Sequence, residues 1–101
     1  MIVAVALFEL HIPYAQSLKE KRMVVRSVRD KLRARYDMSV AEVGMQDLLQ
    51  RARIGLSFVA LDDAAADSSL DRIRSFVEEN TDATVSGWTS EKIAFDEDAT
   101  L

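Results

Sequence analysis

The chain has 101 residues, 49% of them hydrophobic, and a formal net charge of −4, which allows one globular domain with a single core and excludes two. It contains no cysteine, which excludes disulfides, thiol catalysis and cysteine-ligated metal centres. The apolar opening lacks a basic leading segment and is interrupted by Glu9, His11 and Pro13, so we expect no signal peptide, no membrane span and a cytoplasmic protein.

Residues 2–12 alternate between two faces and are apolar on both in their first half, which predicts a central β-strand that Pro13 ends. Ser17 followed by Glu20 is a capping box, and it predicts a helix from about Leu18 to Tyr36. Apolar side chains recur at helical spacing and form its core-facing stripe, with Val24 at the side: Leu18, Val25, Val28, Leu32 and Tyr36.

Residues 39–45 predict a short strand, and residues 46–51 predict a turn before a longer strand at 51–61. In that longer strand the alternation places five side chains toward the core: Ala52, Ile54, Leu56, Phe58 and Ala60.

A second amphipathic helix is predicted over 64–80, with Asp67 or Ser68 available near its N-terminus, and a last strand over 83–95. We expect the domain to cover residues 1–95 and the acidic tail, residues 96–101, to be disordered.

The predicted order β-α-β-β-α-β is the ferredoxin-like α+β arrangement, a four-stranded antiparallel sheet with two helices on one face. Because Val3, Val5, Leu7 and Val59 point to the other face, an apolar surface remains uncovered. A homodimer through this open face or through an edge strand is the simplest way to cover it.

Charge is segregated along the chain. Residues 17–35 hold eight Lys or Arg against two acids, whereas residues 62–101 hold eleven Asp or Glu against three basic residues. We therefore expect an electrically polarised domain.

Five basic residues of the first helix fall within an arc of about 80° that contains no acid. Like charges at this spacing repel by a few tenths of a kcal/mol per pair, so helix stability alone does not favour the arrangement. One interpretation is a surface for an anionic partner such as RNA, bound through its phosphates. The other is a solvated helix face, or one paired with acids of the second helix. The residues are Lys19, Arg22, Arg26, Arg29 and Arg33.

A catalytic cluster has only three candidates, His11, Glu9 and Glu42, because a histidine near a carboxylate can act as a general base or hold a metal. A structural role is the favoured interpretation for His11: we expect its side chain to order the turn toward Ser17 by hydrogen bonding. No phosphate-binding glycine loop or hydrolase motif is present. We expect no catalytic site, no metal site and no cofactor.

Two further features have open interpretations. Trp88 belongs to the core or to a dimer interface more readily than to a ligand platform. A polar hairpin is either a docking surface or a turn nucleated by its aspartate: Gln46, Asp47, Gln50, Arg51 and Arg53. Base stacking on the open sheet face, as in RNA-recognition motifs of this fold, is not expected, because Phe58 faces the core.

The segments ELHIPYAQSLKEKR at residues 9–22 and VAEVGMQDLLQRARIG at 40–55 resemble the YlxP-like proteins, a small bacterial family of unknown function. The resemblance covers roughly residues 1–95. It implies a ferredoxin-like domain. Genes of this family often lie beside those for a translation initiation factor and a ribosome-maturation factor, which implies a role around ribosomes or RNA.

These observations lead to one main hypothesis, a non-enzymatic accessory protein that binds RNA or a ribosomal subunit through its basic first helix. The alternative is a homodimeric protein-interaction or small-ligand-binding module that acts through the open sheet face.

Overall fold

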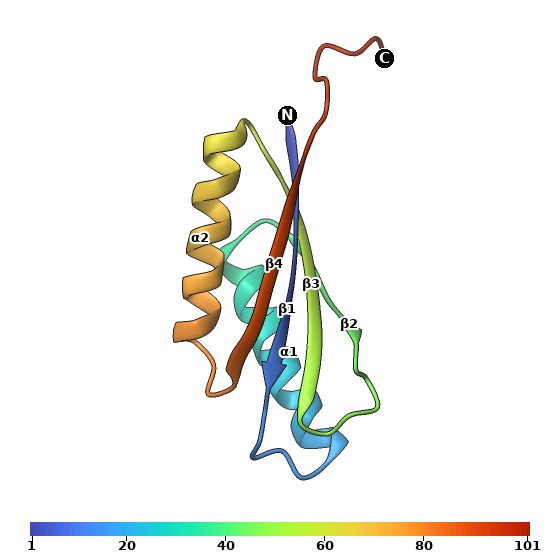
Figure 1. Cartoon of the computed structure of the whole chain (residues 1–101), viewed down its shortest axis with the longest axis vertical. Helices are drawn as coiled ribbons and strands as arrows, with labels where there is room; N and C mark the ends of the chain where they lie inside the picture. Colours follow the sequence, from blue (N-terminus) through green and yellow to red (C-terminus); the bar gives the residue numbers. More distant parts are fainter.

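A computed structural model describes residues 1–101. Figure 1 shows its elements in chain order: β1 (Ile2–His11), α1 (Leu18–Arg35), β2 (Ser39–Gly44), β3 (Arg51–Ala60), α2 (Asp63–Glu79) and β4 (Thr84–Ala94). Every boundary lies within one residue of the range that the sequence predicts. The ferredoxin-like α+β fold is confirmed.

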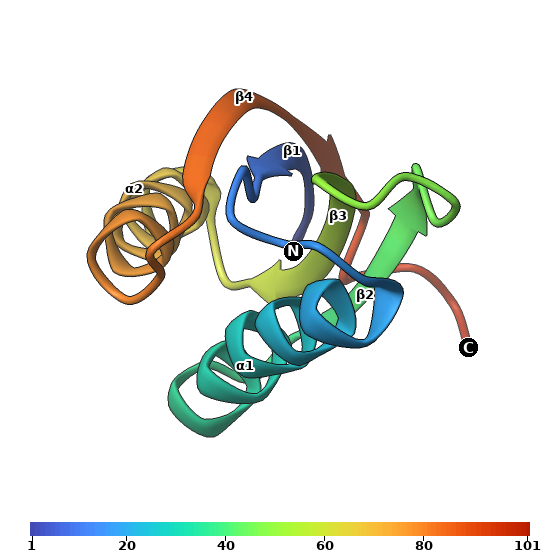
Figure 2. The same ribbon diagram turned by 90° about the horizontal axis from the view of Figure 1, so that it is seen from below.

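The four strands form one antiparallel sheet in the order β2-β3-β1-β4. As the apolar pattern predicts, β1 is central: it pairs with β3 from Ile2 opposite Ala60 to His11 opposite Arg51, and with β4 on its other side. The sheet is strongly twisted, and β4 curves around β1 (Figure 2). α1 lies nearest β2, and α2 lies nearest β1 and β4.

The core lies between the helices and the even-numbered side chains of β1. Phe8 is 1% exposed and stacks on Trp88 with ring centroids 5.1 Å apart, so Trp88 faces the core side of the sheet. Phe58 also packs against the core, as the alternation predicts. The helices contribute six buried side chains to the same cluster: Val25, Val28, Leu32, Leu70, Ile73 and Val77.

Two irregularities in the ladders change which side chains face the core. On β4 the register shifts beside Glu9 and Leu10, so that Val85 and Trp88, three residues apart, both face the helices. On β2 the shift between Glu42 and Gly44 leaves Val43 as an extra residue. Simple alternation of the sequence does not predict either shift.

The helix caps are one place where the prediction needs correction. Ser17 caps α1 as predicted, with its Oγ accepting from the Glu20 amide at 3.1 Å. α2, however, is capped by Asp62, whose carboxylate accepts from the Ala65 amide at 2.8 Å. Because the helix begins at Asp63, the predicted alternatives Asp67 and Ser68 lie inside it and cannot cap it.

The two chain ends lie at the same end of the molecule (Figure 1). The Met1 ammonium donates to the Phe95 carbonyl at 2.9 Å and to the Glu97 carboxylate. Neither helix is long and apolar enough to span a membrane.

The open sheet face carries two apolar rows at the end of the sheet where the chain begins. Val3 on β1 is opposite Val59 on β3 and Ile93 on β4. The next residues outward along the same strands form the second row: Met1, Leu61 and Phe95. Five of these six side chains are exposed, the exception being the half-buried Val3. We call the six residues the apolar rows.

Candidate functional site

The five basic residues predicted from the helical wheel form one continuous line along α1. We call them the basic stripe: Lys19, Arg22, Arg26, Arg29 and Arg33. Four of them are exposed and Arg29 is half-buried. At 1.5 Å per residue the stripe is about 21 Å long. It borders the buried face of the helix on the side of β2.

Four arginines of the stripe line a groove of about 220 Å³ between α1 and the edge strand β2. Val25 of α1 lines the groove with them, and β2 supplies Val40, Ala41 and Glu42. We call this the arginine groove. Arg33 reaches across it and donates to the Val40 carbonyl at 3.2 Å. The groove therefore joins a row of guanidinium groups to the edge of the sheet.

The acids of α2 do not pair with the basic stripe, so the predicted pairing of the stripe with the second helix is wrong. The stripe makes one ion pair, between Arg29 and its neighbour Asp30 at 3.1 Å. The acids of α2 have other partners: Asp63 and Asp67 bind Lys92 at 2.9 and 2.7 Å, and Glu78 binds Arg74. The reason is the rotation of α1, which directs Lys31 toward α2 instead, where its Nζ donates to the Asn80 carbonyl.

A buried lysine sets that rotation. The Lys21 side chain is 2% exposed, and its ammonium donates to the Met45 carbonyl at 2.6 Å and lies 3.1 Å from Glu42 Oε2. Met45 follows β2 and has a left-handed backbone, with φ of 60°. The first turns of α1 are thereby tied to the end of β2 and to the loop that follows it.

The sequence interpretation missed this pair. It counted Lys21 only among the eight basic residues of 17–35 and considered Glu42 as a candidate catalytic carboxylate. The signals were present: Lys21 lies one turn before Val25 on the buried side of the helix, and Glu42 shares the inward parity of the buried Val40. A charged residue at an apolar position in each of two adjacent elements is the pattern that predicts such a pair.

We expect Lys21→Ala to destabilise the fold by about 3–5 kcal/mol, because it leaves the largely buried Glu42 carboxylate without its cation. Lys21→Met/Glu42→Leu, which replaces both partners by apolar side chains, is expected to recover most of that loss. Urea unfolding of the three proteins measures the difference. A double variant no more stable than Lys21→Ala would contradict this assignment.

A second charged cluster lies on the open sheet face, on β1 and β3. Glu9 accepts from Arg51 at 2.7 Å and from Arg53 at 2.9 Å, one guanidinium on each carboxylate oxygen. Hydrogen bonds from Arg53 and then Arg51 lower the pKa of Glu9 below its usual value of 4.5. A carboxylate held in this way is a poor general base, since it keeps its charge to lower pH.

The candidate catalytic residues are not brought together. Glu9 lies on the open face, whereas Glu42 reaches the buried Lys21 beneath α1. His11 is exposed and makes no side-chain hydrogen bond, so its predicted role in ordering the turn is wrong. Gln50 orders that turn instead, because its Nε2 donates to the carbonyls of Pro13 and Ala15 at 3.0 and 3.2 Å.

The polar hairpin is largely engaged within the fold. Gln50, Arg51 and Arg53 use their side chains on the β1 turn and on Glu9. The turn closes through a Leu48 amide to Met45 carbonyl bond of 3.1 Å. Of the five hairpin residues, only Gln46 and Asp47 remain exposed without a side-chain hydrogen bond or ion pair.

We expect Arg51→Gln/Arg53→Gln to raise the pKa of Glu9 toward 4.5. Because the pKa is lowered in the folded state, the ion pairs stabilise the fold at neutral pH, and this contribution is lost as the pH falls below about 4.5. The free energy of unfolding of the variant should therefore fall less between pH 7 and pH 3 than that of the wild type. NMR titration of the Glu9 carboxyl carbon reports the pKa directly, and Arg72→Gln/Arg74→Gln on α2 is the control. An unchanged Glu9 titration in the β3 variant would refute the assignment.

Fold and surface together define a small ferredoxin-like α+β domain with a basic groove along its first helix. The chain belongs to the family described as "Protein of unknown function (DUF503)", whose model matches residues 3–89. It is also similar to the "Uncharacterized protein YlxP" of Bacillus subtilis (strain 168), with 31% identity over 64 residues that cover 63% of this chain and 70% of the relative. The resemblance to YlxP-like proteins is confirmed, and the acidic tail lies beyond the matched range.

Proposed function

We propose that this protein is a cytoplasmic, non-enzymatic accessory protein of RNA or ribosome metabolism, which binds RNA phosphates through its basic stripe. One observation carries the proposal: five basic side chains share one face of α1, and only one of them forms an ion pair, Arg29 with Asp30. Their repulsion costs a few tenths of a kcal/mol per neighbouring pair, and an anionic partner relieves it.

The chemistry of the groove suits phosphate. Arginine presents a planar fork of donors that matches phosphate oxygens, and it is less strongly hydrated than lysine. Four of the five stripe residues are arginines, and all four line the arginine groove. A line of such donors contacts the backbone of a nucleic acid without reading its bases.

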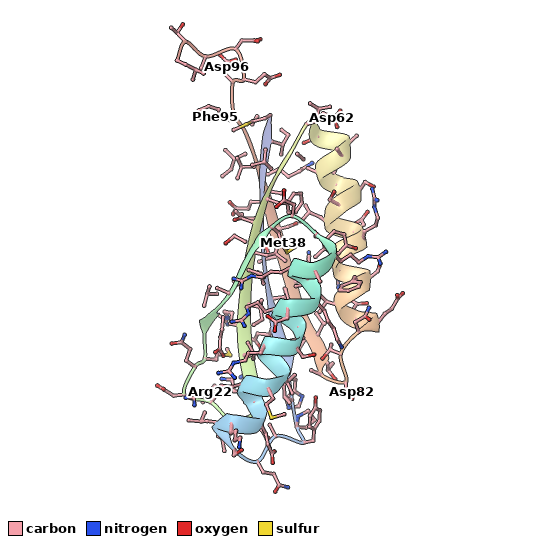
Figure 3. All side chains as sticks on the ribbon, turned by 180° about the vertical axis from the view of Figure 1, so that it is seen from behind. Arg22, Met38, Asp62, Asp82, Phe95 and Asp96 are labelled. Atoms are coloured by element: carbon pink, nitrogen blue, oxygen red, sulfur yellow. The ribbon has the colours of Figure 1, made fainter.

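The distribution of charge supports binding on one side only. In Figure 3 the acids Asp62 and Asp96 lie at the end of the molecule away from Arg22, whereas Asp82 lies toward the Arg22 end, just beyond α2. The basic stripe lies on the β2 side of α1 and the paired acids of α2 have other partners, so a polyanion can approach the stripe from the β2 side. A net charge of −4 is thus compatible with RNA binding.

We expect Arg22→Glu/Arg26→Glu/Arg29→Glu to weaken binding to a structured RNA by about a hundredfold, because three phosphate contacts become repulsive. Wild-type binding should fall steeply with salt, with a log–log slope of roughly −3.5 for five contacts on a single strand and about −4.5 for five contacts on a duplex. Co-sedimentation with ribosomal subunits and fluorescence anisotropy with labelled RNA measure both effects.

The matched control is Lys31→Glu/Arg72→Glu/Arg74→Glu. It changes the net charge by the same amount, but its residues lie outside the stripe, on exposed positions of α1 and α2. Equal losses of RNA affinity in the two variants would mean that the effect comes from net charge and not from the basic stripe. No binding by the wild type at low salt would refute the proposal.

The apolar rows favour a second candidate function, a homodimer formed through the open sheet face. Val59 is 64% exposed and Ile93 51% exposed, on opposite sides of the half-buried Val3. None of the six side chains is charged, so a second copy of the same rows is a complementary partner. This surface lies on the face of the sheet opposite the helices, and both activities can coexist.

We expect Ile93→Asp to shift the protein from dimer to monomer while leaving its fold intact, since the side chain is already exposed. Met23→Asp on α1 is the matched control, because Met23 is 61% exposed and lies outside the sheet. Sedimentation equilibrium over a concentration series gives the association state of each protein. A monomeric wild type, or a dimer that survives Ile93→Asp, would rule out this interface.

A further inference from the structure

We infer that the arginine groove takes the ribose–phosphate backbone of A-form RNA, with Glu42 accepting a hydrogen bond from a ribose 2′-hydroxyl. The inference rests on the proposed function and names the substrate class of the same site. It makes the surface selective for RNA over DNA and for a duplex over a single strand.

The groove has no aromatic side chain on which a base could stack. Tyr14 lies in the depression between α1 and α2, on the other side of α1 from the stripe, and Phe95 lies at the far end of the molecule (Figure 3). Proteins that hold single strands rely on such stacking, whereas duplex RNA is recognised through phosphates and 2′-hydroxyls. The remaining five aromatic residues pack against the core: Phe8, Tyr36, Phe58, Phe76 and Trp88.

The donors are arranged for a run of phosphates. The four groove arginines recur at three- and four-residue steps, so their positions along α1 are about 5 Å apart and extend over roughly 16 Å. A single small anion would engage one or two of them. A polymer with regularly spaced phosphates engages the whole row.

Glu42 is the one acid that lines this groove. Its side chain is 19% exposed, Oε2 is buried against Lys21, and neither oxygen accepts a hydrogen bond from the protein. Four arginines line the same groove, yet none of them pairs with it. Lys21 therefore holds the carboxylate in place as a fixed acceptor.

A carboxylate repels phosphate, so a backbone that fits this groove should offer Glu42 a hydrogen-bond donor between its phosphates. The RNA backbone offers both chemistries in alternation, phosphate oxygens that accept and a 2′-hydroxyl that donates. DNA has the phosphates and lacks the hydroxyl. The groove thus matches RNA in two independent ways, through the arginines and through Glu42.

The test uses wild-type protein and three duplexes of identical sequence and length, made of RNA, of 2′-fluoro RNA and of DNA. The 2′-fluoro duplex keeps the A-form and the phosphates and replaces each 2′-hydroxyl by a fluorine, which cannot donate a hydrogen bond. We expect the RNA duplex to bind about tenfold more tightly than either of the others, the value of one hydrogen bond to a charged group. Fluorescence anisotropy at one fixed salt concentration gives the three affinities.

Lys21→Met/Glu42→Leu is the second arm. It removes the carboxylate without changing the net charge and retains all four arginines. We expect it to bind the RNA and 2′-fluoro duplexes equally well. A preference for RNA that persists in this variant would overturn the role of Glu42.

The outcomes separate this inference from the proposed function. Equal binding of RNA and 2′-fluoro RNA by the wild type overturns the inference and leaves RNA binding standing. Tighter binding of a single-stranded RNA of the same length overturns the A-form assignment. Failure to bind any of these nucleic acids overturns the proposed function as well.

Discussion

The position of α1 depends on one buried ammonium group. Lys21 bridges Glu42 on β2 and the carbonyl of Met45 in the next loop, and a lysine this deeply buried is tolerated only with such partners. The rotation of α1 that satisfies it also places Val25, Val28 and Leu32 in the core. The same rotation aligns the basic stripe with the edge of β2 and turns it away from the acids of α2. The core, the groove and the fixed Glu42 carboxylate are consequences of one arrangement.

The fold places the basic residues of α1 and the acidic residues of α2 on different surfaces. Acids of α2 are used locally: the Lys92 ammonium donates hydrogen bonds to the carboxylates of Asp67 and Asp63, and these bonds raise the pKa of Lys92. The basic stripe has no comparable partner within the fold. Repulsion among five like charges on one helix face lowers the stability of the folded domain. The simplest explanation for keeping these charges is that they bind an anionic partner.

Local pattern was sufficient for most of the architecture. Apolar alternation placed β1 at the centre and Phe58 toward the core, and the Ser17 capping box marked the start of α1. The sequence-based predictions were wrong where a contact between residues far apart in the chain determines the local structure. His11 has the chemistry to order the turn after β1, but Gln50, which is distant in sequence, makes those bonds. The cap of α2 was missed for a local reason. Asp62 and Asp63 are adjacent acids, either of which could cap a helix; Asp62 is the cap, and the helix begins at Asp63.

By itself the sequence determined the class of fold, the order and limits of its elements, and the five residues of the basic stripe, because these follow from periodicities of two and 3.6 residues within single segments. Tertiary structure alone decided that Lys21 and Glu42 meet, that the stripe adjoins β2 and not α2, and that the apolar rows lie together on three strands. These features depend on helix rotation and on strand register. Both are set by packing between segments that are far apart in the chain, and no periodicity within one segment records them.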